Sequence, residues 1–161
     1  MVSVEIERKF LVAHDGWRKI VSRSSKIRDG LIAMSNDRKT RVRILDGRAT
    51  IAVKGQRRGL ARAEFEYEIP VADAEEMLLT MCDDRVLEKT RSYIRHGGLT
   101  WEIDVYDGLL EGVVIAEVEL DRADREVPLP DWVGREITGD VSYSKVKMLA
   151  ARTGERLGKS G

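Results

Sequence analysis

Charged side chains recur at every second position in short segments of this chain, with apolar or neutral residues between them. Six segments show the pattern: Glu5-Ile6-Glu7-Arg8-Lys9, Arg41-Val42-Arg43, Ala52-Val53-Lys54, Arg62-Ala63-Glu64-Phe65-Glu66-Tyr67-Glu68, Glu102-Ile103-Asp104 and Glu117-Val118-Glu119. Arginine and lysine suit phosphate oxygens, and rows of carboxylates supply the hard oxygen ligands that Mg²⁺ or Mn²⁺ accepts. The two kinds of row together predict a site for a metal ion and a phosphate chain.

Candidate ligands can be named from these rows. The basic group is Arg41, Arg43, Lys54, Lys89 and Arg91, and the acidic group is Glu5, Glu7, Glu117 and Glu119. Neither group is specific alone, because a carboxylate row binds any cation and a basic row any anion. A second interpretation stays open, in which the same residues form cross-strand salt bridges on a solvated sheet.

Strands must position these side chains, since strand residues alternate between the two faces of a sheet. One exposed sheet could explain one or two such segments. So many segments, with acidic and basic rows mixed, indicate a sheet curled until its charged faces converge on a polar tunnel. Moving a charged side chain from water into the interior of a barrel costs roughly several kcal/mol of free energy, unless partners, water or a ligand compensate. The pattern therefore favours a ligand-binding interior.

Seven strands are expected from apolar alternation and turn residues, near 4–12, 40–45, 49–54, 61–69, 86–96, 99–106 and 113–120. The turns between them are predicted at Asp46-Gly47, Gly97-Gly98 and Asp107-Gly108, because these residues tolerate positive φ. The glycine-bounded basic loop 55–59 could reach a ligand at a tunnel mouth. These strands predict an antiparallel meander.

Three helical segments complete the expected elements. The first contains Trp17, Ile20 and Val21 at helical spacing. The second is expected to begin with Asp73 as N-cap, and its apolar residues would cover the outside of the barrel. The third is expected over 144–152, ending at Gly154 as the residue after the C-cap.

Length and charge limit the possible functions. The 161 residues predict a single domain over 1–161, with a core of about 3–153 and a frayed tail over 154–161. Lys plus Arg and Asp plus Glu both number 28, so no net charge attracts nucleic acid or a membrane surface. Packing explains Phe65, Tyr67, Trp101 and Trp132 better than base stacking does. No signal peptide or spanning segment is evident, so a cytoplasmic protein is expected.

The ordered series of segments resembles the CYTH proteins, also called triphosphate tunnel metalloenzymes. The opening Glu5-Ile6-Glu7-Arg8-Lys9 is similar to their ExExK signature, and the likeness continues through Arg41-Val42-Arg43, Thr50-Ile51-Ala52-Val53-Lys54-Gly55, Glu64-Phe65-Glu66-Tyr67-Glu68, Glu88-Lys89-Thr90-Arg91, Trp101-Glu102-Ile103-Asp104 and Ala116-Glu117-Val118-Glu119-Leu120. The resemblance covers nearly the whole chain. It implies an α+β fold: an eight-stranded antiparallel β-barrel with helices packed outside.

The resemblance also implies roles for particular residues. Glu5, Glu7 and Glu119 are implied to bind the metal ion, with Glu117 close by, and Lys9, Arg41, Arg43, Lys54, Lys89 and Arg91 to bind phosphate. Glu64, Glu66 and Asp104 are implied to hold a second metal ion or the attacking water. Within these sets, Lys9, Arg41, Lys54, Glu64 and Glu66 are the candidate catalytic residues, and Asp104 joins the metal candidates.

The chain departs from the family pattern at two places. Leu31 stands where many small bacterial members carry a tyrosine, so a role for that phenol near Lys9 cannot operate here. Near the C-terminus, Tyr143-Ser144-Lys145 replaces the more usual ending in asparagine, which leaves the contribution of that position open.

Three functions remain open from the sequence. The leading one is hydrolysis of inorganic tripolyphosphate, or another triphosphate such as ATP, with Mg²⁺ or Mn²⁺. The second is a class IV-type adenylyl cyclase, and the third is a noncatalytic module that binds polyphosphate or nucleotide. A homodimer through outward apolar strand faces is also possible on this sequence.

Overall fold

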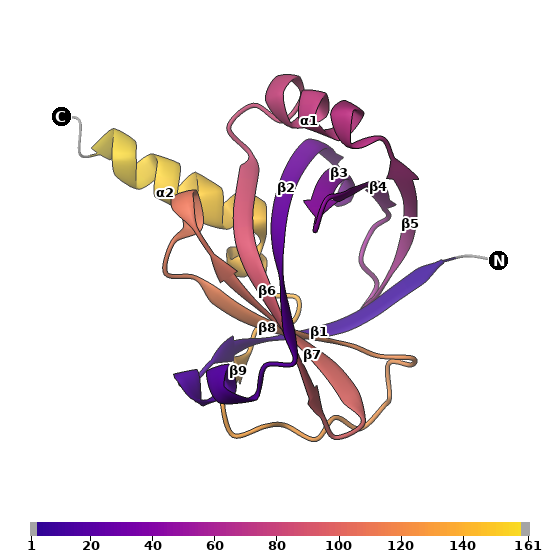
Figure 1. Ribbon diagram of the computed structural model, residues 1–161, viewed down its shortest axis with the longest axis vertical. Helices are drawn as coiled ribbons and strands as arrows, with labels where there is room; N and C mark the ends of the chain where they lie inside the picture. Colours follow the sequence, from indigo (N-terminus) through magenta and orange to yellow (C-terminus); the bar gives the residue numbers. More distant parts are fainter. Residues whose placement is uncertain (1–2, 159–161) are drawn as a thin grey trace.

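The computed structural model describes residues 3–158, with only the backbone given for 154–158, and shows an antiparallel barrel with helices around it (Figure 1). The strands are β1 Val4–Val12, β2 Arg23–Ser35, β3 Arg38–Leu45, β4 Arg48–Lys54, β5 Ala61–Ile69, β6 Val86–His96, β7 Leu99–Tyr106, β8 Val114–Glu119 and β9 Val133–Glu136. The α-helices are α1 Val71–Thr80 and α2 Lys145–Gly158, and the 3-10 helices are η1 Asp15–Ile20, η2 Gly108–Leu110 and η3 Val141–Tyr143.

Eight strands close the barrel in the order β5-β4-β3-β2-β6-β7-β8-β1, and β1 returns to pair with β5. All neighbouring strands are antiparallel, and the short β9 adds to the far part of β1. The predicted α+β class and eight-stranded antiparallel barrel are confirmed. Closure matters for the site because it turns the charged face of every strand toward one interior.

Most of the apolar core lies outside this barrel. One cluster gathers Phe10, Trp17, Trp101 and Trp132 on the outer faces of β1, β7 and β8. A second lies between α1 and the outer faces of β3 and β4, and includes Leu78 and the buried Cys82.

A third cluster packs α2 onto the barrel. It contains Leu87, Tyr106 and Ile115, and Met148 and Leu149 of α2 pack against it. The three strand residues stand two positions from Lys89, Asp104 and Glu117. Because strand faces alternate with a period of two, the interior changes from charged to apolar toward this end.

The sequence predictions missed two strands. β2 is long, but its residues Arg23–Ser35 lack a clean alternation of polar and apolar side chains, so no strand was expected there. β9 has only four residues, too few to give a periodic signal. Seven of the eight barrel strands were therefore predicted, and the missed one, β2, has the sequence that is least typical of a strand.

Helix boundaries were predicted less well than strand boundaries. The N-cap of α1 is Pro70, which makes no side-chain capping hydrogen bond, and not Asp73 as predicted. Asp73 lies inside the first turn, where its negative charge interacts favourably with the helix dipole. The segment around Trp17 is a 3-10 helix with Ile20 exposed.

The last helix is longer than predicted. α2 continues past Gly154 to Gly158, whereas an end at Gly154 was expected. The expected frayed tail over 154–161 falls partly on residues 159–161, which lie outside the described residues.

The surface also corrects one expectation about aromatic residues. Trp101 and Trp132 are buried as predicted, but Phe65 and Tyr67 on β5 are 40% and 61% exposed. They point away from the charged interior because Glu64 and Glu66 alternate with them.

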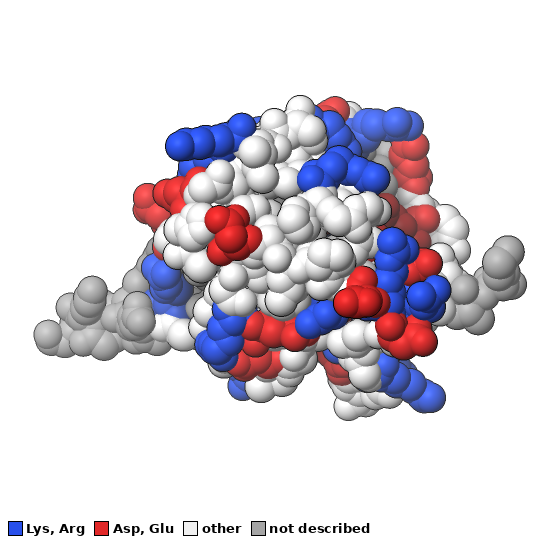
Figure 2. Space-filling view, turned by 90° about the horizontal axis from the view of Figure 1, so that it is seen from below, with Lys and Arg blue, Asp and Glu red and all other residues white. Residues whose placement is uncertain are grey.

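Seen from below, the molecule shows a broad uncharged area bordered by acidic and basic side chains (Figure 2). No helix within residues 3–158 is long and apolar enough to cross a membrane.

The contact between β2 and α1 generates a prediction about Gly30. A Cβ atom added there would lie 2.5 Å from the Sγ atom of Cys82 and 2.6 Å from the Cδ2 atom of Leu78. Gly30→Ala is therefore expected to lower the free energy of unfolding by about 1–3 kcal/mol through overpacking, measured by urea denaturation.

Combining Gly30→Ala with Cys82→Ala tests this cause. Removing the thiol makes room for the new methyl group, so the double variant is expected to lose less stability than the sum of the two single variants. Additive losses would contradict a steric contact between these positions.

Candidate functional site

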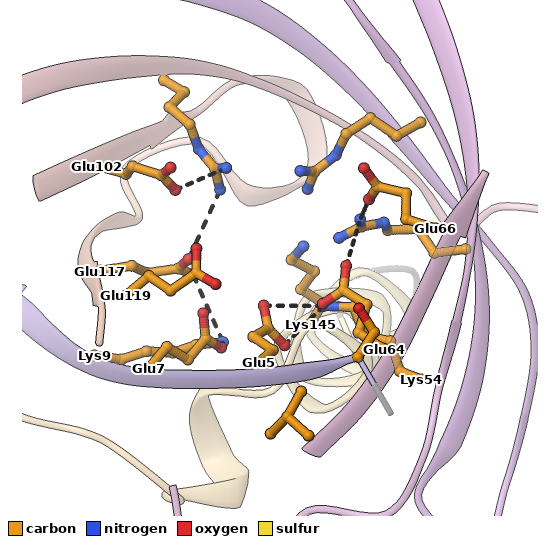
Figure 3. A pocket seen from close by; sticks show the side chains of 15 residues that line it. Glu5, Glu7, Lys9, Lys54, Glu64, Glu66, Glu102, Glu117, Glu119 and Lys145 are labelled. Atoms are coloured by element: carbon orange, nitrogen blue, oxygen red, sulfur yellow. Dashed lines mark hydrogen bonds and ion pairs between the residues drawn. The ribbon is translucent and has the colours of Figure 1, made fainter. Parts of the chain in front are cut away.

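The barrel interior contains a cavity of about 400 Å³ with charged walls (Figure 3). Its walls come from every barrel strand except β2 and from the first residue of α2. The lining residues are Ser3, Val4, Glu5, Glu7, Lys9, Arg41, Arg43, Lys54, Glu64, Glu66, Arg91, Glu102, Glu117, Glu119 and Lys145. All of them except Ser3 and Val4 are charged. The structure thus brings together most of the residues that the sequence singled out.

Carboxylates crowd one wall of the cavity. Glu7 on β1 stands directly opposite Glu119 on β8 in the strand register, a position in which like charges repel. Burial, and then the charges of Glu117 and Glu5, raise the pKa of Glu7. Burial, and then Glu5, Glu7 and Glu64, raise the pKa of Glu119. This wall holds more negative charge than its neighbours neutralise.

Cation partners are shared unequally among these carboxylates. Glu5 pairs with Lys54 at 3.3 Å, and Glu7 pairs with Lys9 and Arg57, both at 3.4 Å. Glu119 forms no ion pair with any residue in the described part of the chain. It is therefore the carboxylate most available to an added cation.

The carboxylates fit a hard divalent cation rather than a preformed all-protein metal cage. Within residues 3–153, whose side chains are described, no three histidine, cysteine, aspartate or glutamate side chains converge closely enough to ligate a metal by themselves. Mg²⁺ usually keeps several waters and takes one or two carboxylates together with substrate phosphates. Glu5, Glu7 and Glu119 offer carboxylate oxygens of the kind that such an ion binds.

Glu117 differs from its neighbours because cations surround it. Its carboxylate lies 3.6 Å from Lys9 and 3.7 Å from Arg91. Although burial opposes ionisation, Lys9, Arg91 and Lys89 hold the pKa of Glu117 well below its ordinary value. Glu117 therefore offsets part of the positive charge of Lys9 and Arg91.

Arg41, on the basic wall, is incompletely paired. Its guanidinium contacts Glu66 at 3.3 Å and Glu64 at 3.9 Å, but its buried Nε atom has no hydrogen-bond partner in the part of the chain that the structure describes. Burial and the neighbouring Arg43 lower the pKa of Arg41. A buried donor left without a partner loses roughly 1–3 kcal/mol. An anionic oxygen in the cavity would satisfy this N–H.

Two lysines complete the ring of cations. Lys54 lies 3.3 Å from Glu5 and 3.4 Å from Glu64, and so joins carboxylates of β1 and β5. Lys9 lies 3.4 Å from Glu7. These ion pairs are longer than the roughly 2.7–2.9 Å of a tight charge-assisted hydrogen bond. Each ammonium can therefore turn to a ligand without losing a strong bond.

Lys89 and Asp104 were expected in the phosphate and metal sets, but they lie behind the cavity wall. The side chains of Lys89 and Asp104 are 1% and 0% exposed, and their charged atoms are 2.7 Å apart. Asp104 also accepts two hydrogen bonds from Arg91, of 2.8 and 2.9 Å. Both carboxylate oxygens of Asp104 thus already accept hydrogen bonds from cations, in an arrangement that holds Arg91 in place, and a metal-binding role for Asp104 stays a prediction.

Asp29 is a buried acid that the sequence predictions missed. It accepts hydrogen bonds from Arg43 at 2.6 and 2.9 Å, and it also lies near Lys145 and Lys89. Although burial opposes ionisation, Lys145, Arg43 and Lys89 hold its pKa well below the ordinary value. The spacing of Ile27, Asp29 and Leu31 on one strand face was the available signal.

Three other residues at the interior were missed, and two of them lie outside the barrel strands. Arg57, from the basic loop predicted to reach a ligand, contacts Glu7. Lys145 enters from α2. Glu102, which pairs with Arg91 at 2.8 Å, belonged to a charged segment but had been given no role.

A second cavity of about 610 Å³ adjoins the first and shares Glu7, Lys9, Arg41, Lys54, Glu117 and Lys145 with it. One side of this cavity is basic, with Lys39, Arg57 and Arg62. Burial, and then Arg62 and Lys9, lower the pKa of Lys39 to about 8. The opposite side is apolar and includes α2. The interior is thus continuous from the charged cavity to the apolar end.

The buried pairing of Asp104 leads to a stability prediction. Asp104→Asn leaves Arg91 without its main counter-charge and Lys89 with only Asp29, 3.5 Å away. A loss of roughly 3–5 kcal/mol in the free energy of unfolding is expected in urea denaturation. The control is Glu102→Gln. Glu102 pairs with the same Arg91, but its side chain is 31% exposed, so this substitution should lower the free energy of unfolding by less than about 1 kcal/mol. Equal losses would show that burial does not decide the effect.

The raised pKa of Glu119 leads to a pH prediction for metal-free protein. A carboxyl whose pKa is higher in the folded state destabilises that state once it is ionised. Glu119→Gln should therefore stabilise the metal-free protein at neutral pH, by less than about 1 kcal/mol because water screens this side chain. The gain should shrink as pH falls below the folded-state pKa and vanish below the lower unfolded-state pKa, where the wild-type carboxyl is protonated in both states.

Urea denaturation at several pH values measures this difference, with the exposed Glu126→Gln as control. A Glu119→Gln variant that is less stable than wild type at neutral pH would mean that Glu119 has a stabilising partner.

Comparison with known proteins places these features in a family. The CYTH domain family model matches residues 3–150. The inorganic triphosphatase of Acetivibrio thermocellus is 42% identical over 139 residues, covering 86% of this chain and 88% of that protein. The inorganic triphosphatase of Nitrosomonas europaea is 37% identical over 153 residues, covering 91% and 96%. The crystal structure of the inorganic triphosphatase NE1496 aligns with a TM-score of 0.63 at 30% identity, covering 90% of this chain and 97% of that one. On its sequence, its barrel and its charged interior, the chain belongs to the CYTH domain family.

Proposed function

We propose that this chain is a metal-dependent triphosphatase that hydrolyses inorganic tripolyphosphate and releases phosphate. The observation that carries the proposal is the cavity with a surplus of carboxylates on one wall and incompletely paired arginines and lysines on the other. Relatives that align over most of their length are inorganic triphosphatases, which supports the same reaction here.

The basic wall would hold the phosphate chain. Arg41, Arg43 and Arg91 offer planar forks that bind phosphate oxygens, and Lys54 and Lys9 offer point charges. Arg43 and Arg91 are held by Asp29 and Asp104, so their orientation is fixed before a ligand arrives. Arg41 brings the unpaired Nε–H described above. A rigid set of donors of this kind suits several phosphate groups in a row.

The acidic wall would hold the divalent ion, with Glu5, Glu7 and Glu119 as its ligands. The surplus charge on this wall fits either Mg²⁺ or Mn²⁺, and family membership implies a divalent metal. When bound, such an ion would supply positive charge that offsets the charge developing during phosphoryl transfer.

The residues of the chain would act mainly by positioning. The cations keep the terminal phosphorus in line for attack by water, and they stabilise the developing charge. Glu64 and Glu66 orient Arg41, and Glu64 also contacts Lys54. Glu64 is the candidate for orienting the attacking water because its carboxylate lies between these two cations. No covalent nucleophile is required.

A double substitution tests the acidic wall. Glu5→Gln combined with Glu7→Gln removes two charges while keeping the side-chain size, and is expected to reduce phosphate release from tripolyphosphate by roughly 100-fold or more. The assay measures phosphate with Mg²⁺ and with Mn²⁺. Glu75→Gln is the control because its ion pair with Arg28 lies on the outer surface. Full activity in the double variant would contradict the proposal.

A substrate panel decides between the remaining functions. Tripolyphosphate, ATP and thiamine triphosphate are compared under both metals, and the ATP products are separated by chromatography. Cyclic AMP with pyrophosphate would indicate cyclisation, and ADP with phosphate would indicate hydrolysis. Tight binding of tripolyphosphate without turnover would indicate a noncatalytic module.

A further inference from the structure

The second cavity carries a surplus of positive charge that the first cavity does not. Eight of its lining residues are cationic and five are acidic, whereas six cations face seven carboxylates in the first cavity. Among the cations that line only the second cavity, three form its basic side: Lys39, Arg57 and Arg62. The proposed triphosphate and metal sites use none of these three.

Hydrogen bonds fix the backbone that carries this basic side. The loop between β4 and β5 lies against the turn between β2 and β3, because the backbone N–H of Arg57 donates to the Asp37 carboxylate at 2.9 Å. The Arg62 guanidinium donates to the carbonyl oxygen of Gly55 at 2.6 and 3.0 Å, and to that of Asp37 at 2.9 Å. The loop and the Arg62 side chain are thus held in place before any ligand arrives.

Lys39 adds a charge that the fold leaves unpaired. It stands directly opposite Lys54 in the register of β3 and β4, a position in which like charges repel. It forms no ion pair with any residue whose side chain the structure describes. Burial, and then Arg57, lower the pKa of Arg62, just as burial, and then Arg62, lower the pKa of Lys39. The cations of the basic side therefore lie close enough to repel one another.

The carboxylates nearest to these cations are shared or exposed. Glu7 lies 3.4 Å from Arg57 and also 3.4 Å from Lys9. Asp37 lies 4.0 Å from Arg62, but its side chain is 52% exposed, and its other oxygen accepts the N–H of Arg57. The basic side thus keeps positive charge that the described side chains do not neutralise in full.

A compact oxyanion fits this side of the cavity better than a second phosphate chain does. Arginine and lysine side chains bind phosphate oxygens, but the opposite side, with Leu87, Ile115 and Met148, offers side chains without hydrogen-bond donors. Glu7 and Lys54 line both cavities, so the basic side adjoins the cavity in which triphosphate would be cleaved. Orthophosphate is the compact anion that this cleavage would produce.

We propose that Lys39, Arg57 and Arg62 form a second anion site, distinct from the triphosphate site, which binds orthophosphate. This inference rests on the proposed function only in that hydrolysis would release orthophosphate next to the site. Bound orthophosphate would supply the negative charge that this side lacks. Because it would bind apart from the substrate, a high concentration of orthophosphate should slow turnover even when tripolyphosphate is saturating.

Calorimetry of orthophosphate binding in Mg²⁺ tests the site directly. Lys39→Met removes the charge and keeps the aliphatic stem, and is expected to weaken binding roughly 10-fold, the size of one lost charged hydrogen bond. The variant should fold, because it relieves the repulsion with Lys54. Lys39→Arg keeps the charge and should restore most of the affinity. Arg38→Met is the matched control, since Arg38 is the exposed neighbour on the same strand, and should bind as the wild type does.

Inhibition of tripolyphosphate hydrolysis by orthophosphate separates this site from the triphosphate site. With pyrophosphate formation as the measured rate, orthophosphate should lower the apparent kcat of the wild type and of Arg38→Met. Lys39→Met should need roughly 10-fold more orthophosphate for the same inhibition, while its KM without added orthophosphate stays within about twofold of wild type. Competitive inhibition that is equal in wild type and Lys39→Met would place orthophosphate in the triphosphate site and overturn the inference.

The two experiments keep this inference apart from the proposed function. A wild type that forms no pyrophosphate from tripolyphosphate would refute hydrolysis, and calorimetry would still decide whether orthophosphate binds through Lys39. Equal affinity of wild type and Lys39→Met for orthophosphate, or no binding to either, would overturn the second site whatever the activity.

Discussion

The structure depends on the opposition of carboxylates and cations inside a closed barrel. Neither set could be buried alone, because removing each ion from water costs roughly several kcal/mol of free energy. Together they neutralise each other only in part: among the described side chains, Glu119 has no ion-pair partner and a buried N–H of Arg41 has no acceptor. The partial pairing allows the charged interior to fold, and the groups that remain incompletely paired are the ones that a ligand would contact.

Burying charge inside requires the apolar core to lie elsewhere. Three clusters on the outer faces and at one end of the barrel supply it, and tryptophans at 17, 101 and 132 carry much of the largest one. The two helices therefore do more than cover the sheet. α1 buries the outside of β3 and β4, while α2 covers the apolar end of the interior and delivers Lys145 to the cavity.

Strands with strict alternation were predictable from the sequence because period-two patterns arise from the chain itself. β1, β5, β6 and β7 were predicted with the bounds that the structure shows. β2 was missed because Asp29 and Gly30 interrupt its apolar residues, although both have clear roles: Asp29 holds Arg43, and Gly30 makes room for α1. The site was predictable where side chains alternate on strands. Lys145 and Arg57 were not assigned because their reach into the interior depends on how a helix and a loop pack.

The pairing of β1 has a consequence for how the protein is made. This strand, near the beginning of the chain, pairs with β5, β8 and β9, and its Arg8 bonds to Glu136, which is 128 residues away in the sequence. Contacts this distant form late, because a long loop must close first. During synthesis, the pairing of β1 with β8 and β9 must therefore wait for most of the chain to leave the ribosome. The Glu7–Glu119 wall assembles only in that final step, so a nascent or truncated chain lacks the complete acidic wall.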